Sequence, residues 1–130
     1  MVVLDTDLLV ALFRGNEEAI EKIKNIEQRG EACVTSITSY ELYKGVYLSS
    51  NSAKNLIQVN NLLSNIKILY FDLESSKISA KIYSYLKKKG ALTNAMDQMI
   101  AAITISKNET LATRNIKHYK NIPELKIEPW

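Results

Sequence analysis

Short apolar runs alternate along the chain with longer segments in which apolar residues recur at helical spacing. A short run of consecutive apolar residues is typical of a strand that is buried on both faces of a sheet. This pattern predicts strands over residues 1–4, 32–35, 66–70, 110–113 and 125–127. The segments between them predict helices over residues 8–13, 16–30, 38–47, 52–63, 72–90 and 94–106. Strands that alternate with helices predict an α/β domain with a mainly parallel central sheet and helices on both faces.

Polar residues and glycines mark the expected helix ends. Asn16, Thr38, Ser52 and Asp72 precede helical segments and can accept hydrogen bonds from free backbone N–H groups of the first turn. Gly30 and Gly90 are expected to end two of these helices. Within the helix that begins at Asp72, the spacing predicts an inward face made by Leu73, Ile78, Ile82, Tyr85 and Leu86.

Length and composition predict one globular domain over residues 1–130, because a chain of 130 residues that is 46% hydrophobic can bury a single core. No apolar run is long enough to cross a membrane, and the N-terminus lacks the pattern of a signal peptide. We therefore expect a cytoplasmic protein that has no membrane partner. Cys33 is the only cysteine, which excludes an internal disulfide and predicts a small buried strand residue. A net charge of +3 is too small to identify a nucleic-acid-binding protein on its own.

Four polar residues lie where the predicted elements would bring them together. Asp5 follows the first strand, Asn115 follows the strand that ends at Thr113, and Glu41 and Asp97 lie on helices. Ligands of α/β sheets bind beyond the carboxyl ends of the strands, where these residues are expected. Carboxylates are rarely buried unless they are paired or bind a cation. Oxygen donors without sulfur or imidazole favour Mg²⁺ (or Mn²⁺) over zinc.

Two of these residues, Asp5 and Glu41, also have a simpler explanation. Asp5 can cap the helix that follows it, and Glu41 can close a capping box with Thr38. Thr6, Ser39 and Thr113 are expected to support the site by hydrogen bonds to carboxylates or to the backbone. For Asp97, the functional role is favoured because Asn94 already supplies a cap to the same helix.

These segments together resemble the PIN-domain ribonucleases, and more narrowly the toxin nucleases of VapBC toxin–antitoxin systems. The resemblance covers nearly the whole chain, through Val3-Leu4-Asp5-Thr6, Thr38-Ser39-Tyr40-Glu41-Leu42-Tyr43-Lys44-Gly45, Asp97-Gln98-Met99-Ile100-Ala101-Ala102, Leu111-Ala112-Thr113-Arg114-Asn115, His118-Tyr119, Ile122-Pro123 and Ile127-Glu128-Pro129-Trp130. It implies a three-layer α/β/α PIN-like fold and an endoribonuclease that uses Mg²⁺ or Mn²⁺ and leaves a 5′-phosphate and a 3′-hydroxyl. Asp5, Glu41 and Asp97 would be the catalytic residues and metal ligands. Asn115 departs from the acidic residue that family members often carry there, and would act as a polar orienting group.

The resemblance also implies partners: an RNA substrate, a VapB-like antitoxin that inserts a segment toward the acids, and a second copy in a homodimer. The apolar residues on the helices around residues 42–63 are expected to form either a dimer or antitoxin face or part of the core. Four basic residues are candidates for contacts to RNA phosphates, or else ordinary solvated charges: Arg14, Lys44, Arg114 and Lys117. His118 is the only histidine and is left outside the predicted catalytic set, because a lone histidine in a loop is more often a surface or packing residue.

Two other functions remain open at this stage. Asp5-Thr6-Asp7 resembles the aspartate pair of haloacid dehalogenase-like phosphatases, although those enzymes require a later lysine and an acidic pair in a larger chain. A PIN-fold domain that binds without catalysis is the third possibility, and the three acids in matching positions argue against it.

Overall fold

The computed structural model describes all 130 residues and contains one five-stranded sheet. The strands are short, and the spatial order is β3-β2-β1-β4-β5. All four pairings are parallel. The bounds are β1 (Val2–Leu4), β2 (Ala32–Thr35), β3 (Lys67–Leu69), β4 (Thr110–Thr113) and β5 (Lys126–Pro129).

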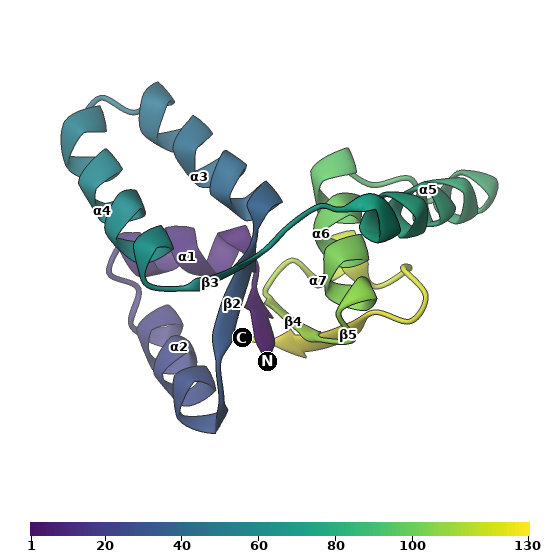
Figure 1. Cartoon of the computed structure of the whole chain (residues 1–130), viewed down its shortest axis with the longest axis horizontal. Coiled ribbons are helices and arrows are strands. Elements are labelled where there is room, and N and C mark those ends of the chain that lie inside the picture. The colour runs from purple at the N-terminus through teal and green to yellow at the C-terminus, as the bar shows by residue number, and fades with distance from the viewer.

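Seven helices connect the strands and cover both faces of the sheet (Figure 1). One group lies on one side of the sheet, α1 (Thr6–Phe13), α2 (Glu17–Arg29), α3 (Ser36–Leu48) and α4 (Ser52–Ser64). The other group lies on the opposite side, α5 (Leu73–Lys88), α6 (Ala95–Ser106) and α7 (Ile116–Tyr119). The predicted three-layer α/β/α fold is confirmed, and the sheet is fully parallel.

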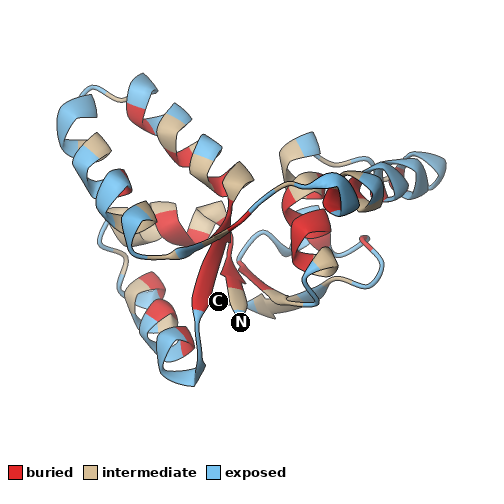
Figure 2. Cartoon of the chain, viewed as in Figure 1, coloured by how far each residue is buried: buried red, intermediate tan, exposed pale blue.

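Two apolar clusters hold these layers together, one on each face of the sheet. Neighbouring strand residues point to opposite faces, so Val3 packs among the residues of α5 and α6 whereas Leu4 packs against α1, α2 and α3. Leu111 and Ala112 of β4 divide between the clusters in the same way. The buried residues therefore line the sheet and the inner helix faces (Figure 2), which makes the central strands a rigid base for the residues that follow them.

The strand order of the sheet reverses between β1 and β4. From β1 the sheet grows through β2 to β3 on one side, and β4 and β5 lie on the other. Ligand sites of parallel α/β sheets form at this kind of switch point, beyond the carboxyl ends of the strands. The Asp5 backbone N–H donates to the Ala112 carbonyl at 3.0 Å, so the residues that follow the two strands begin side by side.

Two predicted helix starts are wrong. Thr35, not Thr38, caps α3: its hydroxyl accepts a hydrogen bond from the Thr38 backbone N–H at 3.1 Å, and the helix begins directly after β2. Ser52 is the first residue of α4 and follows Asn51, whose side chain makes no capping bond. Hydroxyl residues at adjacent positions offer several possible caps, and the strand that precedes the helix decides which one is used. The capping predicted at Asn16 and Asp72 is confirmed.

The predicted inward face of α5 is only partly correct. Ile82 and Leu86 are buried, but Leu73 is 87% exposed and Tyr85 is 38% exposed. Leu73 is the first residue of the helix, directly after the Asp72 cap. Cys33 is buried in β2 as predicted, and burial raises the pKa of its thiol to about 11. No helix is both long and apolar enough to span a bilayer.

Candidate active site

A cleft of about 680 Å³ opens beside the carboxyl ends of β1 and β4. Its walls come from segments that are far apart in the sequence, and most of the residues are polar. The lining residues are Asp5, Thr6, Asp7, Val10, Ala11, Arg14, Asn16, Glu41, Asn94, Asp97, Arg114, Asn115, His118 and Trp130. The fold therefore brings Asp5, Glu41, Asp97 and Asn115 to one cleft.

Asp5 forms the buried floor of this cleft, with 3% of the residue exposed. It caps α1, because its Oδ1 accepts a hydrogen bond from the Thr6 backbone N–H at 2.9 Å. Its Oδ2 accepts a hydrogen bond from the Thr113 hydroxyl at 2.7 Å. Burial raises the pKa of Asp5 to about 7, even though both hydrogen bonds favour the ionised form. Capping therefore accounts for one oxygen of Asp5 but leaves its negative charge without a cation.

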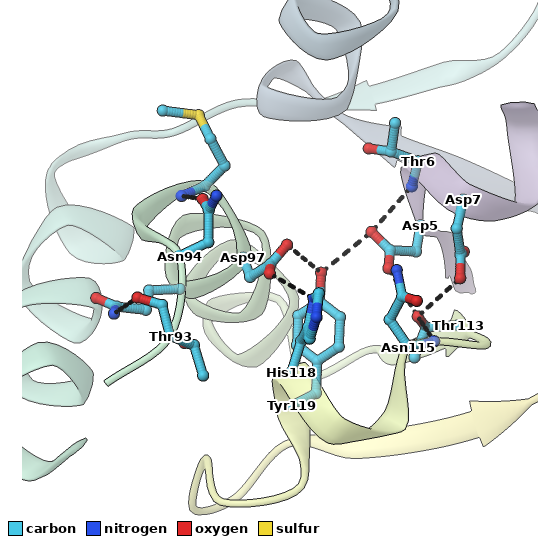
Figure 3. Close-up of polar contacts among 12 residues, drawn as sticks. Asp5, Thr6, Asp7, Thr93, Asn94, Asp97, Thr113, Asn115, His118 and Tyr119 are labelled. Carbon is cyan, nitrogen blue, oxygen red and sulfur yellow. Dashed lines mark hydrogen bonds and ion pairs between the residues drawn. The ribbon is translucent and has the colours of Figure 1, made fainter. Parts of the chain in front are cut away.

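Asp97 approaches Asp5 from the first turn of α6, across a buried tyrosine (Figure 3). The Tyr119 hydroxyl lies 3.1 Å from Asp5 Oδ1 and 3.2 Å from Asp97 Oδ1. A phenol has one proton, so it donates to only one of these carboxylates at a time. Burial and the two neighbouring carboxylates raise the pKa of Tyr119, which keeps the phenol protonated.

His118 contacts the second oxygen of Asp97. Its Nδ1 lies 3.0 Å from Asp97 Oδ2, and just over half of its side chain is exposed. Burial raises the pKa of Asp97, while the contacts from His118 and Tyr119 act in the opposite direction. Asp97 is therefore a half-buried carboxylate whose two oxygens are both fixed in position.

Glu41 lies on the other side of the cleft, on α3. Its Oε1 accepts a hydrogen bond from the Thr6 hydroxyl at 2.6 Å. The capping box with Thr38 does not form, because Thr38 lies inside the helix and its hydroxyl is within 3.0 Å of Thr6 Oγ1. Glu41 is partly exposed, and it has fewer contacts to the protein than Asp5 or Asp97.

The predicted supporting residues differ in how they contact the carboxylates. Thr6 and Thr113 donate hydroxyl hydrogen bonds to Glu41 and Asp5. The Ser39 hydroxyl donates to the Thr35 carbonyl at 3.3 Å and does not contact a carboxylate. Asn115 lines the cleft and makes no side-chain capping bond, while its backbone N–H donates to Thr113 Oγ1 at 3.0 Å.

Only two of the four basic residues predicted to contact RNA line the cleft. Arg14 and Arg114 line the cleft, whereas Lys44 and Lys117 are exposed residues outside its lining. Arg114 is held at the rim, with its guanidinium 3.7 Å from the centre of the Trp130 ring and 2.9 Å from Glu18 Oε2. Lys44 lies over the Tyr40 ring at 5.4 Å.

Sequence reasoning did not place His118, Tyr119 and Asp7 in the site. All three contact or adjoin the predicted carboxylates, through the short helix α7 or the first turn of α1. The only sequence signal was that His118-Tyr119 and Asp7 lie close to predicted site residues. The contacts of His118 and Tyr119 depend on how α7 packs against α6, and those of Asp7 depend on how α1 lies against the end of β4, which no local pattern shows.

The donors of the cleft fit a hard divalent cation. No three of the Asp, Glu, His and Cys side chains lie close enough together to form a ready-made metal site. The buried Oδ1 of Asp7 nevertheless has no hydrogen-bond partner, and burial of Asp5 is not balanced by a cation. Mg²⁺ is usually held by one or two carboxylates and keeps several waters, so the oxygens of Asp5 and Asp97 suit this ion or Mn²⁺.

Known proteins are similar to this chain over nearly its whole length. The tRNA(fMet)-specific endonuclease VapC of Salmonella typhimurium is 29% identical over 127 residues, which cover 98% of this chain and 96% of that protein. Ribonuclease VapC1 of Methanocaldococcus jannaschii is 30% identical over 128 residues, covering 98% and 85%. The crystal structure of VapBC2 from Rickettsia felis bound to a DNA fragment from their promoter contains a chain that matches with a TM-score of 0.92. That match has 28% identity and covers 100% of this chain and 99% of the other.

The model of the PIN domain family matches residues 2–124, which include every carboxylate of the cleft. Its span and the similarity to the VapC proteins confirm the resemblance seen in the sequence motifs. This chain belongs to the PIN domain family.

Proposed function

We propose that this protein is a metal-dependent endoribonuclease and the toxin of a type II toxin–antitoxin pair. The observation that carries the proposal is the pair of buried or half-buried carboxylates, Asp5 and Asp97, that face one cleft with no lysine or arginine paired to either of them. Relatives that are named ribonucleases, and span nearly the same length, support the reaction class. Acting on RNA would place the protein in the cytoplasm.

Asp5 and Asp97 would hold the Mg²⁺ or Mn²⁺ ion, with Glu41 as a further ligand through water. When bound, the ion supplies charge neutralisation for the reacting phosphodiester and lowers the pKa of a water. Tyr119 keeps Asp5 and Asp97 at fixed positions on either side of its hydroxyl. Because the floor is rigid, little reorganisation is needed when the phosphodiester binds.

Glu41 is suited to position the attacking water, because its carboxylate is partly exposed and only its Oε1 is held by the chain. The water oxygen forms a bond to phosphorus as the bond to the 3′-oxygen breaks. The water loses a proton, and the leaving oxygen gains one, giving a 5′-phosphate and a 3′-hydroxyl. Asn115 and Arg114, at the rim of the cleft, would orient the RNA backbone.

A VapB-like antitoxin is the partner that the comparisons support best, because several solved relatives are VapBC complexes. An acidic cleft attracts a basic segment, which would compete with RNA and metal for the same carboxylates. We also expect a homodimer. The exposed apolar residues of α3 and α4, Tyr47, Leu48 and Ile57, are the surface that fits the antitoxin or the second copy.

The proposal is tested by incubating purified protein with a pool of structured RNA in EDTA, Mg²⁺ or Mn²⁺. Asp97→Asn, purified in parallel, controls for a contaminating nuclease. Cleavage that requires metal and disappears in the variant supports the proposal. Cleavage that survives in Asp97→Asn would reject this site, and release of phosphate from p-nitrophenyl phosphate without RNA cleavage would favour the phosphatase alternative. A folded protein that is inactive on both substrates would favour the non-catalytic binding domain.

A further inference from the structure

Asp7 is a carboxylate of the cleft that the mechanism above does not use. It lies in the first turn of α1, two residues after Asp5. Its Oδ2 accepts a hydrogen bond from the Arg114 backbone N–H at 2.9 Å. Its Oδ1 is buried and has no hydrogen-bond partner. Burying a carboxylate oxygen without a donor or a cation is costly, so this atom is expected to have a partner that the chain does not supply.

Two hydroxyl groups link Asp7 to the proposed metal ligands. Thr113 Oγ1 lies 2.7 Å from Asp5 Oδ2 and 3.4 Å from Asp7 Oδ2 (Figure 3). The Tyr119 hydroxyl links Asp5 to Asp97 in the same way. Each hydroxyl carries one proton. The connected carboxylates therefore compete for two hydroxyl protons, and hydrogen bonds from these groups cannot balance their charge.

The side chain of Arg114 does not neutralise Asp7. Arg114 contacts Asp7 through its backbone N–H, while its guanidinium pairs with Glu18 at 2.9 Å and stacks on Trp130. The positive charge of Arg114 is therefore directed to the rim of the cleft. Asn115, on the next position of the same loop, adds an amide without a negative charge.

We propose that Asp7 is a further carboxylate of the cation site, and that its unpartnered Oδ1 binds the Mg²⁺ or Mn²⁺ ion directly or through water. This inference rests on the proposed function, because it concerns the same ion. Asp7 adds a negative charge beside Asp5 and Asp97 on the rigid side of the cleft. The competing explanation is structural: Asp7 would only hold the Arg114 backbone N–H after β4.

Mn²⁺ binding to the full chain, followed by the electron paramagnetic resonance signal of free Mn²⁺, separates these explanations. Asp7→Asn keeps the size of the side chain and an oxygen that can accept from the Arg114 N–H, but it removes the charge. We expect this variant to bind Mn²⁺ at least about tenfold more weakly. The increase in thermal midpoint caused by Mn²⁺ should shrink in parallel. Glu21→Gln removes one charge from an exposed position of α2 and should match the wild type.

Unchanged Mn²⁺ affinity in folded Asp7→Asn would overturn the inference and leave Asp7 with a structural role. Should Asp7→Asn fail to fold, Asp7→Ser gives the same titration and is decided by the same criterion. The titration also separates the inference from the proposed function. A wild-type protein that binds Mn²⁺ but leaves RNA intact would contradict the nuclease assignment, while the role of Asp7 would still be decided by the variant. A wild-type protein that does not bind Mn²⁺ would overturn both.

Discussion

The two sides of the cleft hold their carboxylates in different ways. On one side, Asp5 and Asp97 are fixed by hydrogen bonds from Thr113, His118 and the buried Tyr119. On the other side, Glu41 extends from α3 and receives one hydrogen bond, from the Thr6 hydroxyl. The first side concentrates negative charge in a rigid, desolvated position, which suits a cation. The second side has a partly exposed carboxylate with one oxygen held by Thr6, which suits the positioning of water.

The largest expected effect is on the rigid side. Asp5→Asn should lower the rate of RNA cleavage by roughly a thousandfold, because loss of metal-based charge stabilisation costs several kcal/mol. The fold should persist, since the amide oxygen can still cap α1. Single-turnover cleavage and circular dichroism of the same preparation check both statements, and a folded variant that keeps wild-type activity would show that Asp5 is not needed for catalysis.

The same substitution should change how stability depends on pH. Burial raises the pKa of Asp5 from its usual 3.8 to about 7, so the folded state binds this proton more tightly than the unfolded state. In metal-free wild type, the free energy of unfolding should therefore fall as pH rises from about 4 to about 7, and stay low above that. Asp5→Asn has no ionisable group at this position, so its free energy of unfolding should not fall for this reason. Its stability relative to wild type should rise by on the order of 3 kcal/mol across that window.

Urea denaturation in EDTA at pH 5 and pH 8, for both proteins, measures this difference. A stability difference that is the same at both pH values would mean that Asp5 is well solvated or already neutralised. Saturating Mg²⁺ should remove most of the fall in the free energy of unfolding of the wild type between these pH values, because the cation stabilises the ionised carboxylate.

On the side of the cleft that carries Glu41, Glu41→Gln should lower cleavage by about ten- to a hundredfold, less than Asp5→Asn, because positioning of a proton acceptor contributes less than metal binding. Mn²⁺ affinity should change little. The variant keeps an oxygen to accept from Thr6, so its thermal midpoint should stay close to that of wild type. A loss of Mn²⁺ binding as large as that of Asp5→Asn would show that the two sides act as one ligand set.

The smallest expected effect concerns the hydroxyl between the two rigid carboxylates. Tyr119→Phe keeps the ring in the core and removes the oxygen near Asp5 and Asp97. We expect Mn²⁺ affinity and cleavage to fall by about tenfold, the scale of groups that orient metal ligands. Parallel Mn²⁺ and RNA titrations distinguish a tyrosine that orients the metal ligands from one that only stabilises the core. A purely structural tyrosine would lower the thermal midpoint and leave the Mn²⁺ dissociation constant unchanged.

The sequence predicted the two carboxylates on the rigid side of the cleft but not the residues that hold them in position. Asp5 and Asp97 stand out because each adjoins an apolar run, and the parallel pairing of β1 with β4 predicts that Asp5 lies beside Thr113 and Asn115. Tyr119 and His118 could not be placed, because the packing of α7 against α6 depends on the whole fold. Local signals also failed where several hydroxyl residues are adjacent, so that Thr35 rather than Thr38 caps α3. Because Thr35 caps the helix, the predicted capping box of Thr38 and Glu41 does not form, and Glu41 instead accepts a hydrogen bond from the Thr6 hydroxyl.

The chemical groups at the ends of the RNA fragments distinguish hydrolysis by water at this cleft from attack by the RNA itself. Hydrolysis by a water held at the carboxylate side of the cleft should give fragments with 5′-phosphate and 3′-hydroxyl ends, formed with Mg²⁺ or Mn²⁺ and absent in EDTA. Mass spectrometry of the fragments from one short RNA distinguishes the possible ends. Fragments that carry 2′,3′-cyclic phosphates would show attack by the RNA 2′-hydroxyl and would contradict the account.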